Sequence, residues 1–416
     1  MKTEFIGIGS ELLYGKVQDT NGSWLAKNLH SKGLDFQGIT LCKDEKEDIL
    51  ESLERALKRS DVIFISGGLG PTQDDVTKKI LADYFGKKIV ESEIAASIVQ
   101  ENYQRYGKEW KPDWNHYHHI PEEFEVFDNP KGLAPGLGYY QNGKTILAAP
   151  GVPKEFRSMV DEIFLPWLTE KKLISTKERN QIVVRTHGVP EEMIFNNLAP
   201  TLWEDLSQFG SLSSLPQVLG IDLVITLGEG SNENEVLNRV KDVIAKTELS
   251  HHVWQWGNLT IEELLVKNCN HKGITFSFAE SCTGGLSSHR ITNVSGSSGC
   301  FMGSAVTYSN QAKQNILSVD SSTIKKFGAV SKQTAEEMAK GSREEYASDI
   351  AISWTGIAGP SGGTPEKPVG TLAIGWATSK GVNGSEMVQY SGDRDWLKKR
   401  FSEKGLLKLL ELVETY

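Results

Sequence analysis

The sequence predicts an α/β protein built from more than one domain. Its 416 residues exceed the roughly 100–200 residues of a typical single domain. Short apolar strand patterns alternate with amphipathic helix patterns towards both ends of the chain, which favours parallel sheets covered by helices. Several of these strands run directly into glycine-rich turns, the position at which open α/β sheets bind ligands.

The first segment, residues 1–170, shows a β-α-β-α-β order and predicts a parallel sheet. Strands are expected at Phe5–Ile8, Phe36–Leu41, Asp61–Ser66 and Thr145–Ala149, and helices at Ser23–Ser31, Asp48–Arg59 and Val76–Tyr84. The turn Pro150–Pro153 should lead into a further helix that ends near Leu168. This segment is therefore expected to form one three-layer α/β domain.

A polar stretch at 170–180 indicates a linker to a second, smaller α/β segment over 171–255. Its strands are expected at Gln181–Arg185 and Gly220–Leu227, and its helices at Pro190–Leu198 and Asn232–Ala245. A third segment, 256–416, starts with a helix over Thr260–Asn270, where Thr260 and Glu263 form a capping-box pattern. Later elements are strands at Ile274–Phe278, Gly303–Tyr308, Ile350–Trp354 and Thr371–Trp376, and a helix over 394–413.

Composition and charge exclude several classes of protein. Hydrophobic residues make up 38% and charged residues 24% of the chain, so it is neither disordered nor fibrous. The net charge of −9 comes from residues 1–256, which hold 28 basic and 38 acidic residues, whereas residues 257–416 hold 17 and 16. Because binding to a phosphate backbone needs clustered Lys and Arg, no nucleic-acid partner is expected.

The four cysteines have no CxxC pairing, so neither a disulfide scaffold nor a zinc finger is expected. No stretch reaches the ~18 apolar residues of a membrane span. The N-terminal segment MKTEFIGIGS lacks the apolar core of a signal peptide. A cytoplasmic protein without a membrane partner is therefore predicted.

The sharpest motif is AESCTGG at 279–285, which places Ser281 at a strand-to-helix turn. A Ser hydroxyl there is exposed, and the N–H groups at the helix start can stabilise an oxyanion or bind a phosphate. The alternative from the residues alone is that Ser281 is a helix N-cap and that Gly284 and Gly285 form a tight turn.

Two further segments bear on this choice. The first, YSNQAK at 308–313, supplies Tyr308 and Lys313, and a Lys can act as the base for a Ser nucleophile if it is neutral. The second, TGIAGPSGG at 355–363, is a glycine-rich loop after an apolar strand. Taken alone, Lys313 also fits a solvated helix position, and the loop also fits an ordinary loop.

With KPVGT at 367–371 and GDR at 392–394, these five ordered motifs resemble the C-terminal domain of the competence-damage-inducible CinA family, a nicotinamide-mononucleotide (NMN) amidohydrolase. The resemblance implies Ser281 as nucleophile, Tyr308 and Lys313 as its activating pair, and Thr355 in the pocket. It needs no cofactor for the deamidation.

The same resemblance places the substrate-binding positions, and it shows two departures. The substrate-binding residues would be Thr283, Gly284, Gly285, Gly356, Gly359 and Arg394. Arg394 would hold the phosphate, and a surface helix-capping role is the alternative. Ser361 and Lys398 stand where the family more often has Gly and Arg. Cys282 is the rival nucleophile, since thiolates also attack carbonyl groups; its alternative is a small buried residue.

A second motif, GGLGPTQDD at 67–75, follows the strand Asp61–Ser66. Glycines after a strand can cradle phosphates, and carboxylates just beyond them can hold a divalent cation. The candidate nucleotide-site residues are Glu11, Gly67, Gly68, Gly70, Thr72 and Asp74, with Asp75 as the candidate metal ligand. As the alternative, Asp74 or Asp75 is the N-cap of the next helix.

With DTNGSWLAKNL at 19–29, NPKGLAPGLG at 129–138 and APGVPKEF at 149–156, this segment resembles the family's N-terminal domain. That resemblance implies a molybdopterin-binding-like fold, a KH-like middle domain over 171–255, and a homodimer. In some members the front domain is an ADP-ribose pyrophosphatase that uses Co²⁺ or Mg²⁺, and K⁺ is a further candidate cation. The alternative is a non-catalytic pterin- or nucleotide-binding interaction module.

One further motif has several possible interpretations. The segment WNHYHH at 114–119 contains three histidines. They fit a metal site, or unpaired histidines at the surface or in a pocket, and Asn115 and His119 are candidates for lining the nucleotide pocket. The resemblance to the two family domains implies NMN and ADP-ribose as small-molecule partners of an enzyme of pyridine-nucleotide salvage.

Overall fold

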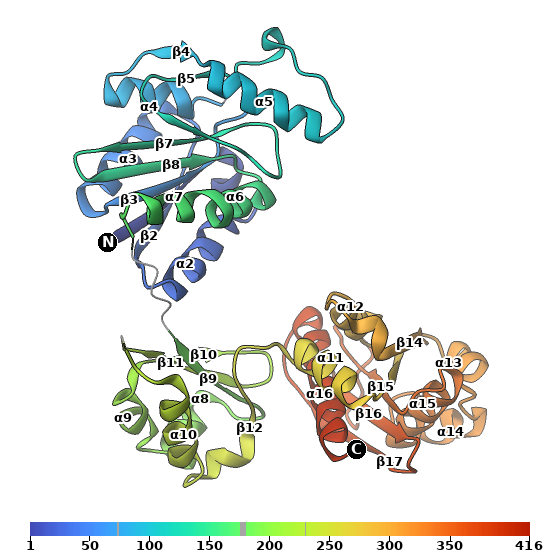
Figure 1. The fold of residues 1–416 in the computed structure, drawn as a ribbon. Helices are drawn as coiled ribbons and strands as arrows, with labels where there is room; N and C mark the ends of the chain where they lie inside the picture. Colours follow the sequence, from blue (N-terminus) through green and yellow to red (C-terminus); the bar gives the residue numbers. More distant parts are fainter. Residues whose placement is uncertain (73–74, 175–179, 229) are drawn as a thin grey trace. The chain divides into compact units, whose positions relative to one another are not determined.

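The computed structural model describes residues 1–72, 75–174, 180–228 and 230–416. They form two compact units, residues 1–180 and 181–416, each with α/β architecture (Figure 1). No helix in these described ranges has both the length and the apolar character of a membrane span. The predicted division at 255/256 inside the second unit stays a prediction, although each side of it has its own sheet.

The first unit has a six-stranded sheet in the order β2-β1-β3-β8-β7-β6. Its strands are β1 (Lys2–Ile8), β2 (Asp35–Cys42), β3 (Val62–Ser66), β6 (Glu125–Phe127), β7 (Gly136–Gln141) and β8 (Lys144–Ala149). The first three and β8 are parallel, as predicted, whereas β6 and β7 add an antiparallel edge. A separate antiparallel pair joins β4 (Ile89–Glu91) to β5 (His119–Pro121).

Helices cover both faces of this sheet because its central strands are apolar on both sides. The helices are α1 (Ser10–Leu13), α2 (Asn21–Ser31), α3 (Lys46–Arg59), α4 (Thr77–Phe85), α5 (Glu93–Arg105), α6 (Pro153–Met159) and α7 (Leu165–Glu170), with a 3₁₀ turn over Pro112–Trp114 and a π-helical turn over Val160–Phe164. Ile63 and Ile65 of β3 pack with α3 and α4 on one face. Phe64, between them, packs with α2, α6 and α7 on the other. The result is the three-layer α/β fold predicted for this segment.

The second unit begins with an antiparallel sheet in the order β10-β11-β9-β12. Its strands are β9 (Gln181–Thr186), β10 (Gly210–Pro216), β11 (Ile221–Leu227) and β12 (Val253–Trp256). Its helical segments are α8 (Glu191–Met193), a π-helical turn over Ile194–Leu198, α9 (Leu202–Ser207), α10 (Glu233–Ile244) and a 3₁₀ turn over Glu248–His252. The strands and helices share one apolar core.

The other sheet of this unit has the order β14-β13-β15-β16-β17. Its strands are β13 (Phe276–Glu280), β14 (Phe301–Val306), β15 (Ile350–Gly356), β16 (Thr371–Thr378) and β17 (Asn383–Gln389). The surrounding helices are α11 (Ile261–Lys272), α12 (Leu286–Thr292), α13 (Asn310–Leu317), α14 (Ser321–Phe327), α15 (Lys332–Glu345) and α16 (Arg394–Thr415), with a 3₁₀ turn over Ser297–Gly299. The first three strands in sequence, β13, β14 and β15, are parallel, and the last two are antiparallel.

Alternation along β13 divides this domain into layers. Phe276 and Phe278 pack into the core shared with α11 and α16, whereas Ala279 packs with α13 and α15. The parallel strands therefore deliver their carboxyl ends, at Glu280 and Gly356, to the same edge of the sheet. The sequence-predicted site residues that follow these strands come together at that edge.

Candidate active site

Ser281 lies directly after β13, and its side chain meets a buried lysine. The Nζ atom of Lys313 lies 2.9 Å from the Oγ atom of Ser281 and 2.8 Å from the carbonyl oxygen of Thr307. Only 1% of Lys313 is exposed, so its interpretation as a solvated helix residue is wrong. Burial lowers the pKa of Lys313 from its usual value to about 8, because low polarity penalises the charged amine.

These two residues line a cavity of about 310 Å³ at the carboxyl edge of the sheet. Five other predicted site residues also line it: Tyr308, Thr355, Gly356, Gly359 and Arg394. The Thr355 hydroxyl donates to the carbonyl oxygen of Ala329, 2.7 Å away. That bond connects Thr355 to the segment between α14 and α15. Ala329 and Val330 of this segment also line the cavity, although no sequence motif marks them as site residues.

Arg394 fixes the rim of the cavity and does not cap its helix. The N-cap of α16 is Asp393, whose carboxylate accepts from the N–H of Trp396. The Arg394 guanidinium donates to the carbonyl oxygen of Gly359 at 2.6 Å and to the Tyr308 hydroxyl at 3.1 Å. Tyr308 itself is 62% exposed, so its hydroxyl lies at the mouth of the cavity.

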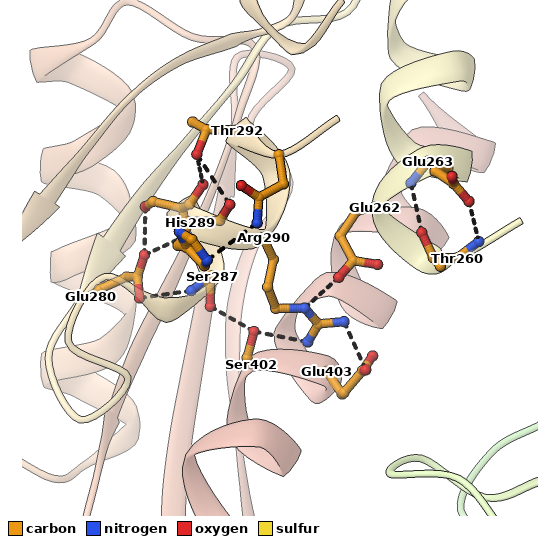
Figure 2. Close-up of polar contacts among 12 residues, drawn as sticks. Thr260, Glu262, Glu263, Glu280, Ser287, His289, Arg290, Thr292, Ser402 and Glu403 are labelled. Carbon is orange, nitrogen blue, oxygen red and sulfur yellow. Dashed lines mark hydrogen bonds and ion pairs between the residues drawn. The ribbon is translucent and has the colours of Figure 1, made fainter. Parts of the chain in front are cut away.

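The start of α12 corrects the prediction that its N–H groups are available to a ligand. The buried carboxylate of Glu280 accepts the N–H groups of Gly285, Ser287 and Ser288, at 2.9–3.2 Å, and the Ser288 hydroxyl at 2.5 Å. Figure 2 shows the contact between Glu280 and Ser287. The N-cap of α12 is Gly285, with φ of 92°. The N-cap interpretation of Ser281 is therefore wrong. The Glu280 carboxylate binds the N–H groups that were expected to bind a phosphate.

Residues 283–285 form this turn, and none of them is among the described residues that line the cavity. Thr283 is fully buried, and Gly284 and Gly285 both have positive φ, which favours glycine. The Nζ atom of Lys398 comes within 3.8 Å of the point where a side chain at 284 would begin. Lys398 thus places a cation beside the turn, on the helix that starts at Arg394.

Cys282 lies in the cavity wall but is poorly suited to attack. Burial raises the pKa of its thiol to about 12, an effect opposed by hydrogen bonding from the N–H groups of Cys282 and Thr283 and by the charge of Lys313. The thiolate is the reactive form of cysteine. A thiol with such a pKa is protonated at neutral pH, which favours Ser281 as the nucleophile.

A second, larger cavity of about 850 Å³ lies in the first unit. The predicted residues in its wall are Glu11, Gly67, Gly68, Gly70 and Asp75. It also contains residues that sequence reasoning did not select as site residues: Asp44, Tyr106, Lys108, Tyr117, Lys131, Lys154 and Glu155. Asn115 and His119 are not in this wall, so the prediction that they line the pocket is wrong, although Tyr117 of the same segment does line it.

The loop after β3 approaches its surroundings too closely for side chains. At Gly68, with φ of 69°, an added Cβ would lie 2.0 Å from the Thr77 hydroxyl oxygen. Asp75 folds back over the loop, and its carboxylate accepts the N–H of Thr72 at 2.9 Å and the Thr72 hydroxyl at 2.5 Å. The N-cap of α4 is Val76, so Asp75 does not cap the helix. Asp74 lies outside the described residues.

Carboxylates and amines share this cavity. Glu11, Asp44, Asp75 and Glu155 supply oxygen atoms, and Lys108, Lys131 and Lys154 supply positive charge. Burial raises the pKa of Glu155, while a hydrogen bond from Asn129 opposes that rise. Carboxylate oxygens beside amines fit a divalent cation together with an anionic phosphate ligand.

Comparison with known proteins places both units in one family. A family model described as the CinA C-terminal domain matches residues 258–413, and one described as a probable molybdopterin binding domain matches residues 4–170. A putative competence-damage inducible protein of Caldicellulosiruptor saccharolyticus is 34% identical over 416 residues, covering 100% of both chains. A CinA-like protein of Kosmotoga olearia is 34% identical over 99% of this chain and 100% of its own length.

Among solved structures, competence/damage inducible protein CihA from Agrobacterium tumefaciens is 34% identical, with a TM-score of 0.36 over 38% of this chain and 97% of that one. The molybdopterin biosynthesis enzyme MoaB from Thermus thermophilus is 18% identical, with a TM-score of 0.30 over 42% and 98%. The two family models match both ends of the chain, and the relatives match it over its full length. This chain belongs to the CinA family of competence-damage inducible proteins.

Proposed function

We propose that the second unit hydrolyses the carboxamide of a nicotinamide nucleotide, with NMN as substrate. The observation that carries the proposal is the 2.9 Å contact between Ser281 and the buried Lys313. A Ser hydroxyl needs a base within hydrogen-bond reach, and a lysine becomes such a base when burial makes its neutral form accessible. A pKa of about 8 leaves roughly a tenth of the lysine neutral at pH 7.

The proposed reaction has two halves. Neutral Lys313 takes the hydroxyl proton of Ser281 while Oγ attacks the carboxamide carbon, and the proton then passes to the amide nitrogen as the C–N bond breaks. Ammonia leaves and an acyl-serine remains. Water then attacks that ester while neutral Lys313 takes one of its protons. Lys313 returns this proton to Oγ as the bond between Oγ and the acyl carbon breaks, which releases nicotinate mononucleotide and free Ser281. The N–H of Cys282, the residue after the nucleophile, suits the oxyanion.

The remaining residues orient the substrate in this proposal. Arg394 lies exposed at the rim with its guanidinium on Tyr308 and Gly359, and Lys398 lies beside the turn at 284. Both are cations that suit a phosphate group. Their position outside the buried Ser281–Lys313 pair matches a nucleotide whose base enters the cavity and whose phosphate stays near solvent.

Ammonia release from NMN tests this proposal. The wild-type protein should release ammonia and form nicotinate mononucleotide, and the Ser281→Ala variant should not. Cys282→Ala is the matched control, because it removes the neighbouring nucleophile and should retain activity. Absence of ammonia from the wild type, or loss of activity in Cys282→Ala with retention in Ser281→Ala, would overturn the assignment.

A second candidate function concerns the first unit, where the 850 Å³ cavity combines four carboxylates with three lysines. We infer that it hydrolyses the pyrophosphate of ADP-ribose to AMP and ribose 5-phosphate. Glu11, Asp44, Asp75 and Glu155 are the residues that would hold a divalent cation. Such a cation supplies charge neutralisation and activation of water, while the lysines bind the phosphates.

The competing candidate is a module that binds a pterin or a nucleotide without turning it over. Incubation with ADP-ribose and Co²⁺ or Mg²⁺, with and without K⁺, separates the two. Formation of AMP supports the pyrophosphatase. Saturable binding of ADP-ribose without formation of AMP under any of these cations supports the binding module.

A further inference from the structure

Three potential metal ligands meet where β4 pairs with β5, outside the walls of both cavities described above. Glu91 ends β4 and His119 begins β5, and the two residues are direct partners in the antiparallel pair. His118 precedes His119 in the chain. One ligand atom from each of these three side chains lies within 4.8 Å of the other two.

The distance between Glu91 and His119 is close to the distance between two ligands of one metal ion. The Nε2 atom of His119 lies 3.5 Å from the Oε1 atom of Glu91. Two ligands bound tetrahedrally at the zinc distances of 2.0–2.2 Å lie about 3.4 Å apart. The separation therefore suits two ligands of one ion, and it also suits a simple ion pair, so the third residue decides between these interpretations.

His118 provides the independent observation. It is 7% exposed, and its buried Nδ1 atom has no hydrogen-bond partner among the described residues. Buried polar atoms are nearly always paired, so an unpaired one calls for a water or an ion. Its ring lies 4.4 Å from that of His119. An ion pair between His119 and Glu91 leaves this buried nitrogen without an explanation.

We propose that Glu91, His118 and His119 bind a divalent transition-metal ion of the zinc class. Two imidazoles and one carboxylate suit Zn²⁺, Co²⁺ or Ni²⁺, whereas Mg²⁺ and Ca²⁺ prefer oxygen ligands alone. The Glu91 side chain is 78% exposed, which gives the ion a path from solvent. A water completes the coordination, or His116, whose ring lies 4.8 Å from that of His119.

The site has a structural consequence for the front cavity. Tyr117, which lines that cavity, immediately precedes His118. The carbonyl oxygen of His118 accepts the N–H of Ser92, the N-cap of α5, at 3.0 Å. An ion bound here holds the end of β4, the start of β5 and the segment with Tyr117 together. This role is distinct from that of a cation at Asp75 in the proposed pyrophosphatase.

The test is a titration of the full-length protein, freed of metal by a chelator, with Zn²⁺ and then with Co²⁺ as a coloured probe. Glu91→Gln and His119→Gln change exposed or partly exposed side chains, so both variants should fold. The matched control is His251→Gln, because His251 lies 3.9 Å from Glu248 in a pair whose side chains are both 78% exposed. Thermal denaturation without metal checks that all variants are folded.

The wild type should bind one Zn²⁺ at this site and give the visible spectrum of Co²⁺ with nitrogen ligands. Glu91→Gln and His119→Gln should each weaken Zn²⁺ binding by more than about tenfold. A loss of about tenfold is what removal of a group that only hydrogen-bonds to a metal ligand can cause. His251→Gln should bind as the wild type does.

The proposal is overturned if the wild type binds no Zn²⁺, or if both site variants bind it with unchanged affinity. Loss of all Zn²⁺ binding in Asp75→Asn, with no loss in the two site variants, would also overturn it by locating the ion in the front cavity. Ammonia release and AMP formation are measured separately, so failure here is distinguishable from failure of either proposed activity.

Discussion

The Nζ atom of Lys313 lies 2.9 Å from the Oγ atom of Ser281 although the two residues are 32 positions apart. Helix α13 begins after β14, and the parallel pairing of β13 with β14 brings its first turn back to the end of β13. Ser281 and Lys313 thus come from neighbouring parallel strands and the helices after them. The contact is a consequence of strand order, which no local pattern contains.

Replacement of Lys313 by Met should remove the base while keeping a long apolar side chain in the buried position. The rate of ammonia release from NMN should fall by about 10²–10⁴-fold, the usual contribution of a positioned acid–base group. Steady-state kinetics measure the loss. Lys326→Met, at an exposed position on α14, is the control and should keep the wild-type rate. Equal rates for the two variants would contradict the role of Lys313.

The pH dependence of the deamidation follows from the lowered pKa of Lys313. Burial brings that pKa to about 8, and the base must be neutral to act. Activity should therefore rise with pH and level off above about 8, with a slope near tenfold per pH unit below it. A profile of kcat/KM between pH 6 and 9.5 measures this limb. A flat profile across that range would contradict a lysine base.

Arg394 should affect substrate binding more than the chemical step. Arg394→Met removes the donors to Gly359 and Tyr308 and a cation at the rim, so KM for NMN should rise by about tenfold or more, as expected for a charge-assisted contact. The kcat should change less. Lys399→Met is the control, because Lys399 pairs with Asp395 on the same helix in an exposed salt bridge.

Glu280→Gln should destabilise the protein. The buried carboxylate accepts four hydrogen bonds at the start of α12, and an amide leaves one or more of those donors facing an NH₂ group. The free energy of unfolding should fall by about 1–3 kcal/mol. Urea denaturation measures the change. Glu263→Gln, in the exposed capping box of α11 shown in Figure 2, is the matched control and should cost less.

Asp75→Asn should separate the activities of the two units. The carboxylate holds Thr72 in the loop of the front cavity, so its loss should abolish formation of AMP from ADP-ribose. Deamidation of NMN should be unchanged, because Ser281 and Lys313 belong to the other compact unit. Parallel assays on one preparation check both statements, and a simultaneous loss of both activities would indicate misfolding.

The sequence predicted the parallel strands well, since apolar β-branched runs such as Val62–Ser66 have few alternatives. It missed the antiparallel strands β4, β5, β6, β7, β10, β12 and β17. Most of these are short or lie at a sheet edge, and their residues are partly exposed, so their hydrophobic pattern is weak. The strand β7 is interior and mostly buried, but Gly136 and Gly138 interrupt its apolar pattern. The ends of predicted elements also shifted, because Gly303–Tyr308 was expected where the structure has Phe301–Val306.

The sequence motifs predicted part of the site. Ser281, Lys313, Thr355 and Arg394 all line one cavity, although the residues alone left Lys313 open between a base and a solvated helix position. The role of Glu280 was missed because a carboxylate before a glycine turn has no local signature of a cap. The cluster of Glu91 with His118 and His119 was out of reach for another reason: a strand pairing across 28 positions brings Glu91 to His119.

The carboxylate of Glu280 leaves the start of α12 with no backbone donors to spare for the phosphate of a nucleotide. In the proposed deamidase, recognition of that phosphate depends on the long cationic side chains Arg394 and Lys398, of which Arg394 is exposed. Attraction between solvent-exposed charges is screened within about 8–10 Å at physiological ionic strength. If the proposal holds, the affinity for a phosphorylated substrate should weaken with added salt while turnover of bound substrate stays constant, so that ionic strength controls substrate binding.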